Sequence, residues 1–158
     1  MGTPNSNWPK WLKASIYKHF DARKGTYTLS FEGQLPKATS GLEAWAELRV
    51  DGPYCQEISK DYWELYVEVN ALISAHKSPD NLYAFDEMIG QFLSAFTSSI
   101  DVLKYGNGVG DNEAQLGCLA MLVGTRQQLQ VSQFGQIEAD SDLQQAVVEA
   151  HYQMHLET

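Results

Sequence analysis

The residues best suited to chemistry are the four histidines, and two of them, His151 and His155, form a pair. On a helix this spacing would let both side chains hold one zinc ion, but the glutamate of an HExxH motif and a nearby cysteine are lacking. On a strand the two side chains would point to the same side of the sheet. They would lie about 13 Å apart, at ~3.3 Å per residue, which is too far for both to bind one metal ion. The surrounding alternation of apolar and polar residues favours a strand, so we expect no metal site.

The other reactive side chains also lack a motif that would activate them. His19 and His76 have no recognisable partner pattern, and surface or packing roles are expected for both. Cys55 and Cys118 are far apart in a chain without a signal peptide, so we expect free, buried thiols rather than a disulfide framework. Apolar neighbours would raise the pKa of the Cys118 thiol, which opposes a nucleophilic role.

The glycine-rich segment 106–110 is the candidate for a phosphate loop. It lacks the GK[ST] ending, and the residues after it look like a strand, whereas a phosphate loop leads into a helix. A flexible hairpin tip is the better interpretation. The sequence thus predicts no catalytic residue, no cofactor and no metal site, and hence a protein that is not an enzyme. An active site assembled from residues far apart in the chain stays open as an alternative.

The charge of the chain is negative and unevenly spread. The net charge is −9; residues 1–60 carry 8 basic and 6 acidic side chains, and residues 61–158 carry 3 and 14. Nucleic-acid binding depends on Lys and Arg that neutralise phosphates, so this balance argues against it. Three interpretations remain: a surface that repels nucleic acid, a surface that imitates it, or a solvated acidic surface without a partner.

Length and composition indicate one globular domain. The chain has 158 residues, of which 44% are hydrophobic and 20% charged. We find no apolar run near the ~20 residues that span a bilayer, and the first residues lack the pattern of a signal peptide.

The elements that must position the side chains follow from hydrophobic periodicity. Apolar residues at helical spacing predict helices over 8–23 and 79–98, the second opened by Ser78 and Pro79. Alternation predicts strands over 26–32, 42–50, 62–73, 100–105, 115–123, 126–133 and 147–157, and Asp51–Pro53 are expected to form a turn. The predicted fold is one α+β domain, a mostly antiparallel β-sheet flanked by an N-terminal helix and a longer central helix.

Large apolar side chains on the nominally polar strand faces are the unusual feature. Trp45 falls on the face opposite Leu48, and Tyr66 and Leu72 fall on the face opposite Val67. Such residues often mark a contact with another chain, so we name Trp45, Tyr66 and Leu72 candidate interface residues. Burial under the N-terminal helix or a long loop is the alternative explanation.

Three stretches resemble sequences of phage neck and tail-completion proteins: Trp8–Phe20, Ala46–Pro53 and Glu68–Ile73. Together with the order of one helix, three strands, a second helix and a closing set of strands, they look like the tail terminator proteins of long-tailed bacteriophages. The likeness covers most of the chain as topology, and the stretches that carry it are structural rather than catalytic.

The resemblance implies a virion protein of the tail or neck, made in the host cytoplasm and assembled as a homo-oligomer, a hexameric ring. The ring would end tail-tube growth and join the tail to the neck through a tail tube protein and a neck or connector protein. DNA would pass through without sequence-specific binding, and no membrane would be involved. Loops 33–41 and 106–111 would reach neighbouring subunits, which makes Asn107 and Asp111 candidate interface residues.

Two other functions stay open. The chain is alternatively an acidic inhibitor that imitates DNA and binds a basic nuclease or repressor in a salt-sensitive way. It is also compatible with another neck or head–tail connector component, because the same α+β plan would serve several of them.

Overall fold

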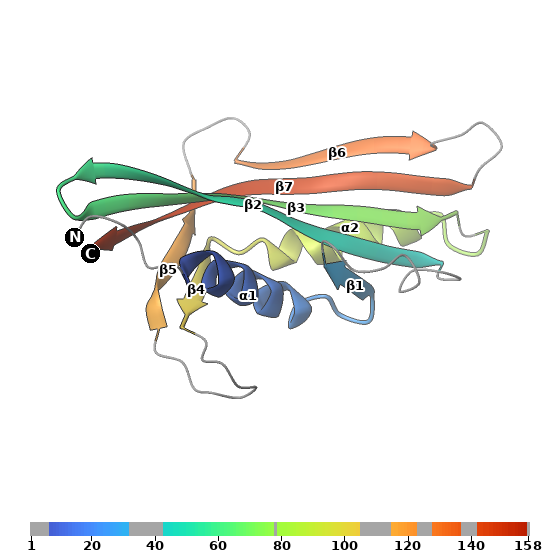
Figure 1. Cartoon of the computed structure of the whole chain (residues 1–158). Helices are drawn as coiled ribbons and strands as arrows, with labels where there is room; N and C mark the ends of the chain where they lie inside the picture. The colour runs from blue at the N-terminus through green and yellow to red at the C-terminus, as the bar shows by residue number, and fades with distance from the viewer. Residues whose placement is uncertain are drawn as a thin grey trace.

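A computed structural model of the protein describes residues 7–31, 43–77, 79–104, 115–122, 128–136 and 142–157. Its elements are, in chain order, α1 (Trp8–Asp21), β1 (Thr28–Phe31), β2 (Ala44–Ser59), β3 (Tyr62–His76), α2 (Ala84–Ala95), β4 (Ser99–Leu103), β5 (Gln115–Met121), β6 (Leu129–Gln136) and β7 (Leu143–Glu157). The strands form one curled sheet, and both helices lie against the same face of it (Figure 1). The α+β class therefore holds.

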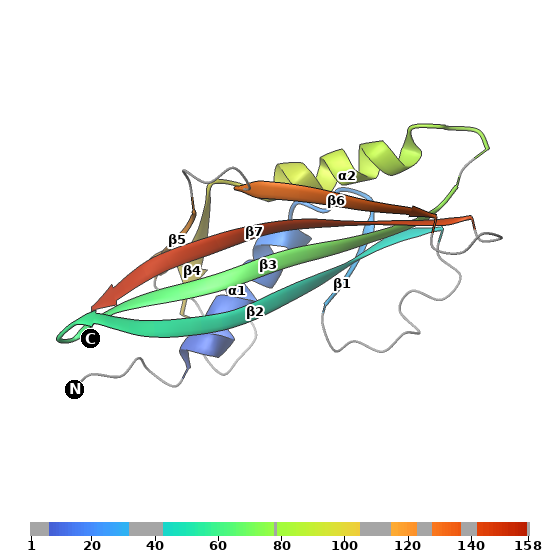
Figure 2. The same cartoon turned by 90° about the horizontal axis from the view of Figure 1, so that it is seen from above.

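The sheet is mixed rather than purely antiparallel. Its strand order is β1-β2-β3-β7-β5-β4, with β6 as a further partner of β7. β1 runs parallel to β2, and the other described pairings are antiparallel. β7 pairs with β3 along one edge and divides its other edge between β6 and β5. The long strands β2, β3 and β7 form a twisted ribbon whose hairpin extends beyond the helices (Figure 2).

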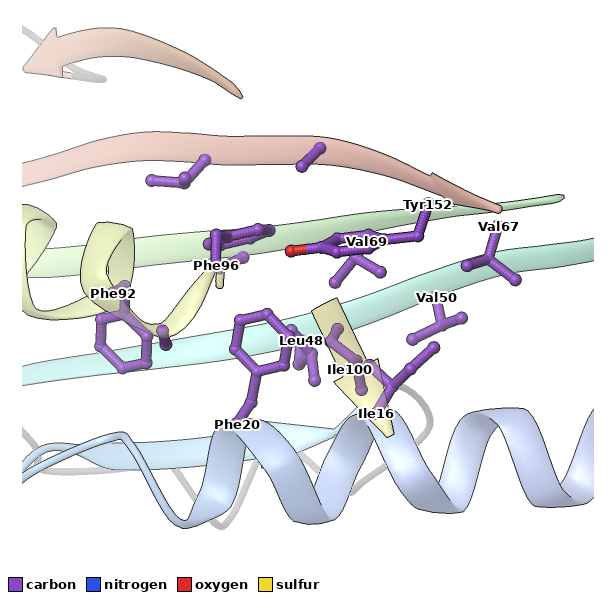
Figure 3. Packing of buried hydrophobic residues seen from close by; sticks show 14 of the residues in the cluster. Ile16, Phe20, Leu48, Val50, Val67, Val69, Phe92, Phe96, Ile100 and Tyr152 are labelled. Atoms are coloured by element: carbon purple, nitrogen blue, oxygen red, sulfur yellow. The ribbon is translucent and has the colours of Figure 1, made fainter. Parts of the chain in front are cut away.

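The core lies between the sheet and the two helices. We call the helix-covered side of β2, β3 and β7 the inner face and the opposite side the outer face. Alternate residues of β3 are buried on the inner face: Leu65, Val67, Val69, Ala71, Ile73 and Ala75. Figure 3 shows Ile16 and Phe20 of α1 pointing toward Leu48 and Val50 of β2. The alternation read from the sequence thus decides which side of the sheet the helices cover.

The largest fully buried side chain, Tyr152, has a polar tip that needs a partner inside the core. Its hydroxyl donates a hydrogen bond of 2.8 Å to the carbonyl oxygen of Thr97, in the connection between α2 and β4. Burial raises the pKa of Tyr152, so the phenol stays neutral and donates. This bond ties the last strand to the connection between α2 and β4.

The predicted helix over 79–98 is wrong in length, and so is the expectation of a longer central helix. α2 has 12 residues and α1 has 14. Ser78, the expected cap, lies outside the described residues. Asn81 explains the later start, because its Oδ1 accepts a hydrogen bond of 2.9 Å from the backbone N–H of Tyr83. This local turn competes with helical geometry, and the helix begins at Ala84.

The predicted turn at Asp51–Pro53 is also wrong, because β2 continues to Ser59. The pairing with β3 shifts between Asp51 and Tyr54, as in a β-bulge. Gly52 has a φ of +110°, and a Cβ on it would lie 2.9 Å from the carbonyl oxygen of Tyr66. The Gly-Pro pair therefore bends a continuing strand instead of ending it.

Several smaller differences concern strand ends and the cysteines. β7 begins at Leu143, four residues before the predicted start, and β6 runs to Gln136, three residues past the predicted end. The expected burial of Cys55 and Cys118 is wrong, because both free thiols are exposed. Cys118 alternates with the buried Leu119 on β5, and Cys55 lies on β2 after the bulge, where it pairs with Leu65.

Candidate functional site

The outer face of β2, β3 and β7 is the surface on which the predicted interface residues meet. Successive rows across the strands are Trp45–Ser74–Gln145, Glu47–Leu72–Val147, Arg49–Asn70–Glu149, Asp51–Glu68–His151, Tyr54–Tyr66–Gln153 and Gln56–Glu64–His155. The strand period of two places every one of these side chains on the side away from the helices. The site is therefore a broad surface of the sheet rather than a cleft.

The structure places Trp45, Tyr66 and Leu72 on this outer face, half-buried by their neighbours. Because α1 packs on the other face, burial under that helix does not explain them. Trp45 and Leu72 lie in adjacent rows, whereas Tyr66 is three rows further along the sheet. Asn107 and Asp111 lie outside the described residues. The interface role of all five residues stays a prediction.

The outer face is acidic. Its carboxylates are Glu47, Asp51, Glu64, Glu68 and Glu149, and Arg49 is the basic residue among the rows. Arg49 donates from Nε to Oε1 of Glu47 at 2.9 Å. Asp51 stands directly opposite Glu68 in the β2–β3 register, and like charges in that position destabilise a sheet. Glu68 also accepts a hydrogen bond of 3.2 Å from Nδ2 of Asn70. The row thus carries two carboxylates that a cation from outside would neutralise.

Aromatic and imidazole rings surround this carboxylate pair. The hydroxyl of Tyr66 lies 2.5 Å from Nδ1 of His151, and the two rings stack with centroids 5.6 Å apart. The ring of Tyr54 lies 6.3 Å from that of Tyr66. A hydrogen bond to Asp51, together with its charge, raises the pKa of Tyr54, while burial and then the charge of Glu68 raise that of Tyr66. Both phenols stay neutral near pH 7.

A hollow of about 520 Å³ opens beside these rings at the base of the hairpin. It is lined by Tyr54, Cys55, Gln56, Glu64 and Tyr66. Carboxylate oxygens and the faces of tyrosine rings are the groups that attract an ammonium or guanidinium ion. The hollow therefore has the lining expected of a site for a Lys or Arg side chain.

Most of the large exposed apolar residues lie at the two ends of the sheet, with Val131 midway along β6 as the exception, a feature that the sequence analysis missed. At the hairpin end, Tyr54 is 54% exposed, Ile58 51% and Tyr62 37%. At the other end, Leu82 is 86% exposed and Phe134 60%. The 15 residues of β3 separate the ends by about 46 Å, at ~3.3 Å per residue. The sequence held one signal of the hairpin end, because Ile58 is a lone apolar residue among polar neighbours.

The exposed side of α1 is basic, in contrast to the outer face. Lys10, Lys13 and Lys18 lie on the helix, and Arg23 and Lys24 follow it. Lys24 pairs with Asp21 at 2.7 Å, and Arg23 donates to the carbonyl oxygen of His19 at 3.0 Å. A hollow of about 460 Å³ between α1 and β4 is lined in part by Lys18 and Arg23, with Asp101 of β4 as the acid beside them. The helix layer and the outer face therefore carry opposite charge.

The four histidines lie in packing or surface positions. His19 is half-buried, with Nε2 3.0 Å from the carbonyl oxygen of Ala95, and burial lowers its pKa. His76 ends β3 and pairs with Asp142 at 2.7 Å, a contact that lowers the pKa of that carboxyl. His151 and His155 both lie on the outer face of β7, where His155 stacks on Tyr62.

Within the described ranges, no three His, Cys, Asp or Glu side chains are grouped as metal ligands would be. None of the described helices has the length and apolar character that crossing a membrane requires. Neither a protein-family model nor a curated protein matches this chain.

Proposed function

We propose that the protein is a structural virion protein that forms a ring at the head-proximal end of a phage tail. The ring ends tail-tube growth and joins the tail to the neck. The observation that carries this proposal is the presence of two separate apolar ends on one sheet, one at the hairpin and one around Leu82 and Phe134. A ring between a tube and a neck needs two rims that recognise different partners.

The two ends differ enough to serve different partners. The hairpin end presents Tyr54, Ile58 and Tyr62 on a narrow extension of the sheet, which Figure 2 shows reaching beyond the helices. The opposite end presents Leu82 and Tyr83 before α2, together with Phe134 of β6. Exposed apolar groups of this size favour contact with another protein. We assign one end to the tail tube protein and the other to the neck or connector protein.

The charge of the chain suits a ring through which DNA moves. A net charge of −9 repels phosphates, so duplex DNA would pass a ring of such subunits without being held. This reasoning agrees with the resemblance to tail terminators and with passage that is independent of sequence. The hexameric ring size comes from the resemblance alone.

The test is to remove the chain from the virus that encodes it, by a stop codon early in its gene, and to image the particles. The proposal predicts tail tubes of unregulated length and heads without tails. A copy of the gene with Ile58→Ser and Tyr62→Ser should lose one of the two functions, and a copy with Leu82→Ser and Tyr83→Ser should lose the other. Tails of normal length that are joined to heads would refute the proposal.

The opposed carboxylates Asp51 and Glu68 favour a second candidate, an acidic inhibitor that imitates DNA. This function predicts a monomer or dimer that binds a basic nuclease more weakly as salt increases. Titration of the chain into a panel of basic nucleases, at low and high salt, separates it from the ring. A further neck or head–tail connector component would also form an oligomer, but its loss would leave tail length normal.

A further inference from the structure

We propose that the basic side of α1 in one copy docks on the acidic outer face of the next copy, and that this contact closes the ring. This contact rests on the proposed ring and specifies which surfaces of neighbouring subunits meet in it. The two ends of the sheet then stay available for the rim partners, because the contact uses the helix layer and the outer face instead.

The charges of the two surfaces are complementary. The α1 segment carries five cations, Lys10, Lys13, Lys18, Arg23 and Lys24, against one acid, Asp21, for a balance of +4. The rows of the outer face carry five carboxylates, Glu47, Asp51, Glu64, Glu68 and Glu149, against Arg49, for a balance of −4. Equal and opposite charge steers two surfaces together and penalises contacts between like surfaces.

The two surfaces cannot meet within one chain. The apolar side of α1, including Leu12 and Ile16, is buried against the inner face, and Lys10 is exposed on the other side of the helix. Lys18 and Arg23 lie at the hollow between α1 and β4 and also face away from the outer face. Figure 1 shows α1 below the ribbon of β2, β3 and β7, on the side opposite the outer face. Two complementary surfaces on opposite sides of one subunit produce head-to-tail contacts, and such contacts close into rings when the rotation permits.

The outer face also has a place for a cation. Asp51 and Glu68 stand opposite each other in the register of β2 and β3, and the hollow lined by Tyr54, Glu64 and Tyr66 lies in the next rows. A lysine from the next copy would neutralise the carboxylate pair and rest its ammonium group against a tyrosine ring. Lys10 is exposed in the first turn of α1 and is the cation we assign to this hollow.

The test uses two charge-reversed variants of the full chain. The helix variant carries Lys10→Glu and Lys13→Glu, of which the first places an acid in the first turn of α1, where it complements the helix dipole. The sheet variant carries Glu64→Lys and Glu68→Lys, and the second change sets a cation opposite Asp51 in the register. Neither variant should unfold, and far-UV circular dichroism checks this. Lys60→Glu, in the hairpin turn, is the matched control.

We expect the wild-type chain and the control to assemble at about 50 mM salt, where surface charges are weakly screened. Each variant alone should show a dissociation constant raised on the order of 100-fold or more. An equimolar mixture of both variants should recover a closed oligomer, because the two kinds of subunit then alternate. Every second contact joins a native helix to a native sheet, and the contacts between these set the substituted acids of α1 against the substituted lysines of the sheet. A head-to-tail ring with an even number of subunits allows this alternation.

Three outcomes would overturn the contact. These are a wild-type chain that stays monomeric at low salt, variants that assemble as the wild type does, and a mixture that fails to recover assembly. A monomer whose outer face instead binds polylysine, with loss of binding in the sheet variant, would mean that a different basic protein is the occupant. The contact and the ring function can fail separately. If the mixture recovers assembly but the gene-deficient virus has normal tails, the contact between copies is supported and the tail function is refuted.

Discussion

The inner and outer faces of β3 consist of alternate residues of the same strand, yet they belong to different environments. Ile73 is fully buried beneath the helices, whereas its neighbour Leu72 is half-buried on the open side. Inner residues are apolar at every position from Leu65 to Ala75. Outer residues include Glu64 and Glu68, which gain nothing from core packing. The comparison teaches that core packing determines the composition of the inner face, whereas the outer face is free to suit solvent or, under the proposal, a neighbouring copy.

The largest expected effect is a difference in stability between variants of the two neighbours Ile73 and Leu72. Ile73→Ala should lower the free energy of unfolding by about 2–5 kcal/mol, because it opens a cavity in the core. Leu72→Ala should cost less than about 1 kcal/mol, since its side chain is only half-buried, but should weaken self-assembly. Urea denaturation and measurement of native mass give the two quantities. Equal losses of stability would abolish the distinction between the faces.

The next effect concerns the bulge that lets β2 continue past Pro53. Gly52→Ala should lower the free energy of unfolding by about 1–3 kcal/mol, because an added Cβ meets the carbonyl oxygen of Tyr66 and the positive φ is strained. Gly90→Ala is the matched control, since nothing lies within 4 Å of a Cβ there. In mid-helix this change should stabilise by about 0.5–1 kcal/mol. Thermal unfolding of both variants checks the opposite signs.

A pH effect is expected from His19 on the inner side. Burial lowers its pKa in the folded protein, so folding favours the neutral imidazole. The unfolded chain takes up the proton first, near a pKa of about 6.5, so this contribution is present above that pH and is lost as pH falls through the folded pKa. His19→Gln should flatten the loss of stability below pH 6.5 in urea titrations. An unchanged pH profile in the variant would contradict this role.

The smallest effect comes from the outer face, where one substitution should raise the stability of the subunit and weaken its self-assembly. Glu68→Gln leaves Asp51 without a like charge opposite it in the register, so the stability of the subunit should rise by about 0.2–1 kcal/mol. The same change should weaken self-assembly, because it removes one of the carboxylates that attract α1 of the next copy. Denaturation of the dilute subunit and sedimentation at higher concentration separate the two readouts. A gain or a loss in both would sink the assignment.

Much of the fold could be predicted because the spacing of apolar residues along a helix or strand reflects which of its sides is buried, and this spacing is visible within a short stretch of sequence. The alternation around Val67 and Tyr152 places β3 and β7, and the stripe from Trp11 to Phe20 places α1. The end of β2 could not be predicted, since Gly52 and Pro53 are turn residues in isolation. Whether they end a strand or bend it depends on β3, which follows later in the chain and continues the pairing.

The candidate site was predictable only in part for a similar reason. The alternation assigns Trp45, Tyr66 and Leu72 to one face without saying what stands beside them. The contact of Tyr66 with His151 joins residues 85 positions apart, and it exists because β7 pairs with β3. The opposed carboxylates depend on the register between β2 and β3. Pairings of this range are set by tertiary structure and leave no local pattern in the sequence.

The most direct test of the central claim, assembly of the chain into a closed head-to-tail ring, is the native mass of the wild-type protein at increasing salt. Our account predicts one closed species at low salt, with six subunits if the resemblance to tail terminators holds. It also predicts dissociation as salt screens the contact between α1 and the outer face. A monomer at every salt concentration, or a two-fold dimer that salt does not affect, would contradict the account.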